Sequence, residues 1–216
     1  MTSRKALPFQ YLVALFLLVS GAANAQPARV VDGDTIEMGS VRYRLNGIDA
    51  PEHGQACGAW RCGDEATAHL AAMIDGQDID CAGAGTDGYG RTLATCYVGG
   101  ADLGKRMIDD GFAWAFVKYS RAYEVEEAAA RNSGVGIWQG NFQAPWDFRS
   151  EKWAVAIQTA PSGCPIKGNI SGNGKIYHAP WSPWYSKTKI SGSKGERWFC
   201  SEGEAVEAGW RAPLWK

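Results

Sequence analysis

The sequence predicts an α+β fold, mainly β, followed by a small separate unit. Residues 28–48 are rich in Val, Ile, Arg and Tyr, and their side chains alternate, which is typical of two or three strands joined by tight turns. Residues 77–82 and 92–98 indicate two more strands around a loop rich in Gly and Asp. Helical patterns fall between and after these strands, so we expect a mixed fold rather than an all-β one.

Three segments carry apolar residues at helical spacing. The first covers 63–76, the second is marked by Leu103 and Met107, and the third covers 123–132. The aromatic segment 112–119 is expected to be extended. Five short strands with about three helices between and after them predict a five-stranded barrel of the OB type, a fold often used to hold nucleic acid or sugar chains.

The first 25 residues differ from the rest of the chain. Arg4 and Lys5 precede an apolar run over 7–19, and the small-residue pattern Ala23-Asn24-Ala25 follows. This order predicts a secretory signal peptide that is cut after Ala25. The apolar run is short for a membrane span, which argues against the alternative of an uncleaved anchor. We therefore expect a secreted or periplasmic monomer with no membrane association after cleavage.

The remaining chain divides by composition. We expect an OB-type domain over 26–140, a connector over 141–163 and a small accessory domain over 164–216, which is too short for a good core without a disulfide. Residues 26–150 hold 11 Lys and Arg against 18 Asp and Glu, net −7, and residues 151–216 hold 9 against 5, net +4. An acidic domain attracts a polyanion poorly, so a bound divalent cation and local arginines would have to offset that charge, and the basic tail could help.

The six cysteines indicate disulfides, because an even number is typical of exported proteins. Sequence alone leaves many pairings open. Two cysteines share one loop, two flank a probable hairpin, and two bracket the C-terminal unit. The pairs we predict on these grounds are Cys57–Cys62, Cys81–Cys96 and Cys164–Cys200. A zinc site is disfavoured because no cysteines form a CxxC and the histidines do not complete a zinc spacing.

Carboxylates and arginines gather at the ends of the short strands. Asp34, Asp49 and Glu52 can hold a hard cation through oxygen ligands. Arg44 and Arg91 can bind a phosphate through their planar guanidinium groups. Proteins can cut phosphodiesters by directing a cation and a guanidinium at one point. Taken singly, each of these residues also fits an ordinary turn or a surface ion pair.

Three motifs stand in one order along the chain. They are Val31-Asp32-Gly33-Asp34-Thr35, Arg44-Leu45 with Ile48-Asp49-Ala50-Pro51-Glu52, and Asp87-Gly88-Tyr89-Gly90-Arg91, with weaker matches at Gly111-Phe112-Ala113 and Gly136-Ile137-Trp138. The whole pattern resembles the staphylococcal nuclease (thermonuclease) family over roughly residues 28–140.

The resemblance implies an OB-fold nuclease that uses Ca²⁺, cleaves DNA and RNA, and leaves 3′-phosphate ends. The metal would be held by Asp34, Asp49 and the backbone carbonyl of Ala50, where the family often has threonine. Asp32 would act on the metal from a second layer of contacts.

The remaining matched positions would contact the substrate or the attacking water. Glu52 stands at the position of a general base or water-orienting carboxylate, and Arg44 and Arg91 at positions that clamp the phosphate. Tyr89 and Tyr119 match substrate-contacting tyrosines, and a packing role for Tyr89 remains open.

Three features depart from the family pattern. The loop after Glu52 carries a disulfide pair, Gly88 replaces a lysine, and the domain is acidic. His53, next to Glu52, is expected to be a surface loop residue rather than an acid or base. The departures leave the catalytic set intact and bear on affinity and substrate preference.

The C-terminal unit is similar to small modules appended to exported bacterial nuclease-like proteins. Its basic charge and its aromatic residues Trp181, Trp184, Tyr185 and Trp198 suit a nucleic-acid strand or a glycan, and suit an aromatic mini-core equally well.

The sequence thus predicts a secreted, calcium-dependent endonuclease whose partner is DNA or RNA. One alternative is a non-catalytic OB-fold module that binds nucleic acid or an envelope polysaccharide. A further alternative is a phosphodiesterase with a different substrate.

Overall fold

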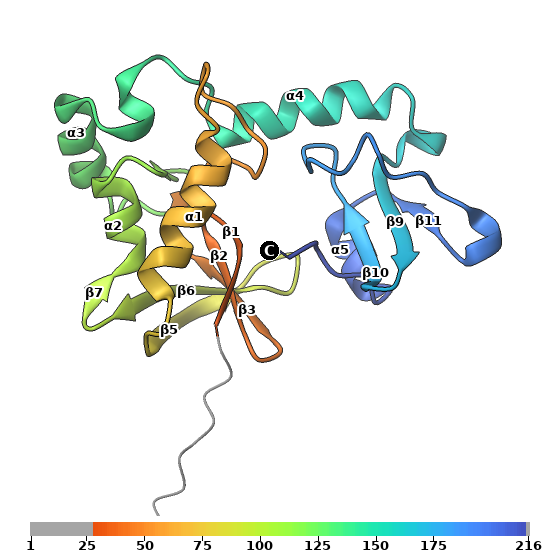
Figure 1. Cartoon of the computed structure of the whole chain (residues 1–216), viewed down its shortest axis with the longest axis horizontal. Coiled ribbons are helices and arrows are strands. Elements are labelled where there is room, and N and C mark those ends of the chain that lie inside the picture. Colours follow the sequence, from red (N-terminus) through yellow and green to blue (C-terminus); the bar gives the residue numbers. More distant parts are fainter. Residues whose placement is uncertain (1–27, 215–216) are drawn as a thin grey trace, which may run out of the picture.

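The computed structural model describes residues 28–214, so the predicted signal peptide lies outside the described residues. Within residues 28–214, no helix is long and apolar enough to span a bilayer. The described chain forms a sheet-based part over residues 28–140, called the nuclease part here after the family that its sequence resembles, and a smaller C-terminal unit. Helix α4 (Pro145–Ile157) runs from one to the other (Figure 1).

The main sheet of the nuclease part has the order β1-β2-β3-β6-β5, with β7 added beside β6. Strands β3 and β6 pair in parallel, and the other neighbours in this sheet pair antiparallel. A separate two-stranded sheet joins β4 to β8. The strands of this part are β1 (Arg29–Asp32), β2 (Thr35–Met38), β3 (Val41–Leu45), β4 (Ile48–Asp49), β5 (Ile79–Thr86), β6 (Thr92–Val98), β7 (Ala101–Asp102) and β8 (Trp114–Ala115).

The predicted mainly β, OB-like fold is confirmed, but among the described residues its sheet does not close into a barrel. Within residues 28–214, no pairing joins β1 to β5, so the OB-like sheet stays open. The outer part of β5 is exposed and consists of small residues, Gly83-Ala84-Gly85, which offer little apolar surface to cover. Helix α1 packs against β1 at the other edge of the sheet. Pairing β1 with β5 would therefore bury little additional apolar surface.

The nuclease part contains the three predicted helices, α1 (Cys62–Ile74), α2 (Leu103–Asp109) and α3 (Glu124–Ser133). Helix α1 buries Ala66, Leu70 and Ile74 against the sheet. These side chains join a continuous apolar core that includes Ile36, Leu45, Ile48, Met107 and Ile108. The short 3₁₀ helix η1 (Gly136–Gln139) closes this part.

Helix α4 occupies most of the segment that we expected to be a connector. Proline suits its first position because its missing N–H has no partner inside a helix. Trp146 and Ala144, at the start of α4, pack with Trp114 and Ile137 in a second apolar cluster. The helix is therefore attached to the nuclease part by packing as well as by the chain.

The C-terminal unit has a three-stranded sheet of order β10-β9-β11 and one short helix, α5 (Glu202–Glu207). Its strands are β9 (Ile166–Ser171), β10 (Gly174–His178) and β11 (Arg197–Phe199), and its 3₁₀ helices are η2 (Pro161–Gly163) and η3 (Gly192–Lys194). Its core is small and largely aromatic, and consists of Ile166, Tyr177, Phe199, Ala205 and Trp210.

All three predicted disulfides are confirmed. Cys57–Cys62 closes the loop after Glu52, Cys81–Cys96 joins paired positions of β5 and β6, and Cys164–Cys200 links the start of the C-terminal unit to the end of β11. The last bridge is the staple that we expected for a unit with so small a core.

Candidate active site

An open cavity of about 620 Å³ lies where the nuclease part meets α4 and the C-terminal unit. The β1–β2 turn, the end of β3, the segment after β4 and the 87–91 loop form its nuclease side. The sequence-predicted residues that line it are Asp32, Asp34, Arg44, Ala50, Glu52, Tyr89, Arg91 and Tyr119. These residues, which span much of the nuclease sequence, therefore share one solvent-accessible site.

Asp34 holds the two halves of the main motif together. It lies in the β1–β2 turn, where Asp32 Oδ1 accepts from the Asp34 backbone N–H at 3.2 Å. Asp34 Oδ2 accepts from the backbone N–H of Ala50 at 3.0 Å, and Oδ1 accepts from the Thr35 hydroxyl at 3.0 Å. The two buried hydrogen bonds fix the Asp34 carboxylate beside the residue that follows β4.

Asp49 lies in β4 and its side chain is 0% exposed. Arg44 donates from Nη2 to Asp49 Oδ1 at 2.9 Å, and its Nη1 forms an ion pair with Asp34 Oδ2. Burial lowers the pKa of Arg44, while Asp49 opposes that change. A single guanidinium thus bridges both of the carboxylates that the sequence assigned to a metal.

Arg149 is the residue that sequence reasoning missed. It lies in the second turn of α4, and its Nη2 donates to Asp49 Oδ2 at 2.7 Å. Its Nη1 donates to Asp49 Oδ1 at 3.0 Å and to Glu52 Oε1 at 2.7 Å. Nothing in the local sequence distinguished it from an ordinary surface arginine.

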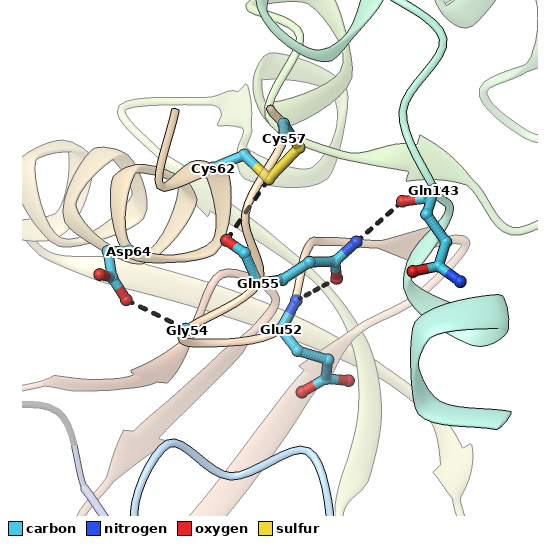
Figure 2. Close-up of a disulfide and its surroundings, with 7 residues drawn as sticks. All are labelled: Glu52, Gly54, Gln55, Cys57, Cys62, Asp64 and Gln143. Atoms are coloured by element: carbon cyan, nitrogen blue, oxygen red, sulfur yellow. Dashed lines mark hydrogen bonds between the residues drawn. A yellow bond between two sulfur atoms is a disulfide. The ribbon is translucent and has the colours of Figure 1, made fainter. Parts of the chain in front are cut away.

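Glu52 is held by its backbone as well as by Arg149. Its N–H donates to the Gln55 side-chain oxygen at 3.0 Å, and Gln55 in turn donates to the carbonyl of Gln143 at 2.8 Å. Figure 2 shows this chain of contacts next to the Cys57–Cys62 bridge. Burial raises the pKa of Glu52 to about 7, against the opposing effect of Arg149.

Arg91 comes from a tight turn after β5. Asp87 Oδ1 accepts from the backbone N–H groups of Tyr89 and Arg91, and Asp87 Oδ2 accepts from Arg91 Nε at 2.7 Å. The Arg91 guanidinium lies 5.2 Å from the centre of the Tyr89 ring. Tyr89 and Tyr119 are 41% and 71% exposed, so both rings are free to meet a ligand.

The C-terminal unit supplies part of the cavity wall, which the sequence did not predict. Trp181 and Glu202 line the cavity, and Glu202 accepts from the Tyr177 hydroxyl at 2.8 Å. A Cβ added to Gly203 would lie 3.1 Å from the carbonyl oxygen of Gly88, so α5 sits directly on the 87–91 loop. This unit therefore limits the space above the site.

His53 does not line the cavity. Its Nδ1 lies 2.8 Å from Asp64 Oδ1, and its ring stacks on Trp184 at 5.3 Å between centres. Because Trp184 belongs to the C-terminal unit, His53 is a contact residue between the two parts. His53 lies in a loop as expected, but its side chain is 17% exposed and packs between the two parts rather than on an open surface.

The fit of a metal depends on Arg149. Among residues 28–214, no group of three or more His, Cys, Asp or Glu side chains is placed to hold a metal ion. Asp34 and Asp49 offer the hard oxygens that Ca²⁺ prefers, and Arg44 shows that one cationic group reaches both. However, Arg149 covers both oxygens of Asp49. The donor set fits a hard cation once the guanidinium groups of Arg149 and Arg44 no longer occupy these oxygens.

Comparison with known proteins places this chain in a family. A model described as staphylococcal nuclease homologue matches residues 42–140. A micrococcal nuclease from Shigella flexneri is 34% identical over 158 residues, covering 63% of this chain and 88% of the relative. The chain belongs to the staphylococcal nuclease family. As a member of this family, it is a nuclease, a hydrolase of phosphodiester bonds.

Other relatives and a second family model also match this chain. An uncharacterized endonuclease of Haemophilus influenzae is 31% identical over 181 residues, covering 77% of this chain and 98% of the relative. The succinoglycan biosynthesis protein ExoI of Rhizobium meliloti is 36% identical over 140 residues, covering 59% and 73%. A second family model, described as ArfC, matches residues 148–212. Arg149 lies in this second match and outside the nuclease match.

Proposed function

We propose that this nuclease is an exported, calcium-dependent endonuclease that hydrolyses DNA or RNA and leaves 3′-phosphate ends. The observation that carries the proposal is the convergence of Arg44, Arg91 and Glu52 on one open cavity above two buried aspartates. A module that only binds nucleic acid needs arginines and aromatic rings, and has no need of a buried carboxylate aimed at the same point.

Each residue has a specific role in this proposal. Asp34, Asp49 and the Ala50 carbonyl hold the calcium ion, with Asp32 supporting them. When bound, the ion stabilises negative charge on the phosphate oxygens. Arg44 and Arg91 donate to the nonbridging oxygens through their planar forks. Tyr89 and Tyr119, both exposed at the rim, contact the nucleotide.

Hydrolysis proceeds by in-line attack of water on phosphorus. Glu52 takes the proton from the attacking water, or orients that water, from within hydrogen-bond reach. The bond between phosphorus and the 5′ oxygen breaks, and that oxygen leaves with a proton from solvent. The new ends are a 3′-phosphate and a 5′-hydroxyl.

The proposal includes the compartment and the domain organisation. The signal peptide over 1–25 is removed, the catalytic domain covers 26–140, the connector covers 141–163 and the accessory domain covers 164–216. Three disulfides support export, because such bonds persist in oxidising compartments. The mature protein acts as a monomer.

The test is cleavage of end-labelled single-stranded DNA and RNA by the mature, oxidised protein, with calcium and then with excess chelator. We expect cleavage that chelator abolishes and calcium restores. Glu52→Gln and Arg91→Lys should each lower kcat by about a hundredfold or more, since loss of one preorganised group costs about 3–4 kcal/mol. The exposed Glu65→Gln and Arg121→Lys are the matched controls and should cleave normally.

A second candidate function is recognition of an envelope polysaccharide without catalysis. The relative whose name refers to succinoglycan biosynthesis favours it. A folded protein that cleaves neither DNA nor RNA in either condition, yet binds an acidic polysaccharide, would support this candidate and contradict the nuclease proposal.

A further inference from the structure

The contact of Arg149 with the site is too extensive to be an ordinary surface ion pair. Its guanidinium touches both oxygens of Asp49 and one oxygen of Glu52, at 2.7 to 3.0 Å. The Asp49 side chain is 0% exposed and that of Arg149 is 23% exposed. A forked guanidinium on a buried carboxylate is among the strongest charge-assisted pairings in proteins.

The origin of Arg149 is as informative as its contacts. It is 100 residues from Asp49 in the sequence and comes from helix α4. This helix begins after the part of the chain that matches the nuclease family. The residue that neutralises the buried carboxylates is therefore supplied from the region that leads into the C-terminal unit.

Arg149 and a divalent cation have the same binding partners. Calcium takes oxygen ligands at about 2.3–2.6 Å and so needs direct access to carboxylate oxygens. Both oxygens of Asp49 already accept from Arg149, and Asp49 Oδ1 also accepts from Arg44. A calcium ion that uses the Asp49 oxygens must therefore compete with the guanidinium of Arg149 for them, and the two positive charges repel each other.

We infer that Arg149 is an internal cation that occupies Asp49 and Glu52 in the metal-free protein and competes with calcium for them. The inference rests on the proposed function, because it takes Asp49 as a calcium ligand. Helix α4 thereby sets the calcium affinity of the nuclease site, and metal binding requires the guanidinium to leave. The displaced guanidinium remains attached to α4 at the edge of a cavity that already presents Arg44 and Arg91.

The experiment is calorimetric titration of calcium into the mature, oxidised full chain without substrate. Arg149→Gln removes the competing charge, and we expect calcium to bind roughly tenfold more tightly, within the usual range for coupling between ligands. Arg149→Lys keeps the charge without the fork and should tighten binding by a smaller factor. Lys152→Gln, an exposed cation on the same helix with no carboxylate contact among the described residues, is the matched control and should bind calcium like the wild type.

Thermal unfolding provides a second readout that does not involve activity. Without Arg149, Asp49 loses its main partner, so Arg149→Gln should melt at a lower temperature than the wild type in chelator. Calcium should raise the Tm of Arg149→Gln by more than it raises that of the wild type. If Arg149→Gln does not fold, the calcium affinity of Arg149→Lys decides the question.

The outcomes separate the inference from the proposed function. The inference is overturned if the wild type binds calcium and a folded Arg149 variant binds it equally well or more weakly. The metal site would still stand in that case. Absence of calcium binding in the wild type and in every variant would overturn the metal part of the proposed function, and the inference with it.

Discussion

The nuclease part and the C-terminal unit are stabilised in different ways, although both form walls of the same cavity. The nuclease core is a continuous cluster of aliphatic side chains between sheet and helices. Up to residue 214, the C-terminal core has five buried residues and depends on aromatic packing and one long-range disulfide. A small core gives a small free energy of unfolding. The cavity wall formed by Trp181 and Glu202 should therefore unfold locally before the nuclease side of the cavity does.

The largest expected difference between the two regions concerns their disulfides. Removing Cys164–Cys200 by paired Ala substitutions opens a loop with a sequence separation of 36, and should cost about 4 kcal/mol by loop entropy. Removing Cys57–Cys62, with a separation of 5, should cost only about 2 kcal/mol. Urea unfolding with hydrogen exchange would measure both. Equal losses, or loss of protection in the nuclease core first, would contradict the contrast.

The next effect tests what fixes the position of Glu52 on the nuclease side of the cavity. A Cβ at Gly63 would overlap the carbonyl group of Glu52. Gly63→Ala should therefore displace Glu52, lower kcat by about a hundredfold and cost about 1–3 kcal/mol of stability. Gly172, in the C-terminal unit, has open space where a Cβ would lie, so Gly172→Ala is the control. Normal turnover by a folded Gly63→Ala would show that the position of Glu52 is not critical.

A smaller effect distinguishes the C-terminal unit by its response to acid. Burial, and to a lesser extent Lys167, lowers the pKa of His178 to about 4 from 6.5. The unfolded chain takes up this proton first, so the contribution of neutral His178 is complete above pH 6.5 and is lost as the pH falls toward 4. We expect a loss of roughly 2 kcal/mol over this range.

Chemical unfolding of the wild type and His178→Gln at several pH values would measure this effect. The wild type should lose stability more steeply on acidification, because glutamine has no proton to gain. Identical slopes for the two proteins would show that His178 is not held neutral by the fold. The ring makes close contacts with Asn169 and Ser182, so a neutral control variant at Ser182, Ser182→Ala, would separate the lost hydrogen bond from the lost titration.

Local pattern predicted most of the nuclease part, and long-range packing decided the rest. The motif residues Asp34, Arg44 and Glu52 lie at turns and strand ends, whose geometry follows from neighbouring residues, and the structure brings them to one cavity. The disulfide pairs were predictable because each is either local or the only staple for a small unit. The roles of the site residues remain predictions.

The features that could not be predicted from the sequence depend on contacts between distant segments. Arg149 meets Glu52 across 97 residues, and no motif around it signals that contact. Helix α4 replaces most of the expected connector because the start of this helix packs on Trp114, which lies far away in the sequence. The open sheet also escaped prediction, since closure depends on whether the edges of β1 and β5 gain by meeting, which no single strand encodes.

The amide of Gln55 has a practical consequence for dividing this protein. This side chain is 1% exposed and joins the Glu52 backbone to the carbonyl of Gln143, just before α4 begins (Figure 2). A chain cut after residue 140 would strand that buried amide, uncover Trp114 and Ile137, and remove Arg149. A chimera that contains the nuclease part should therefore also include residues 141–149, whatever unit follows them.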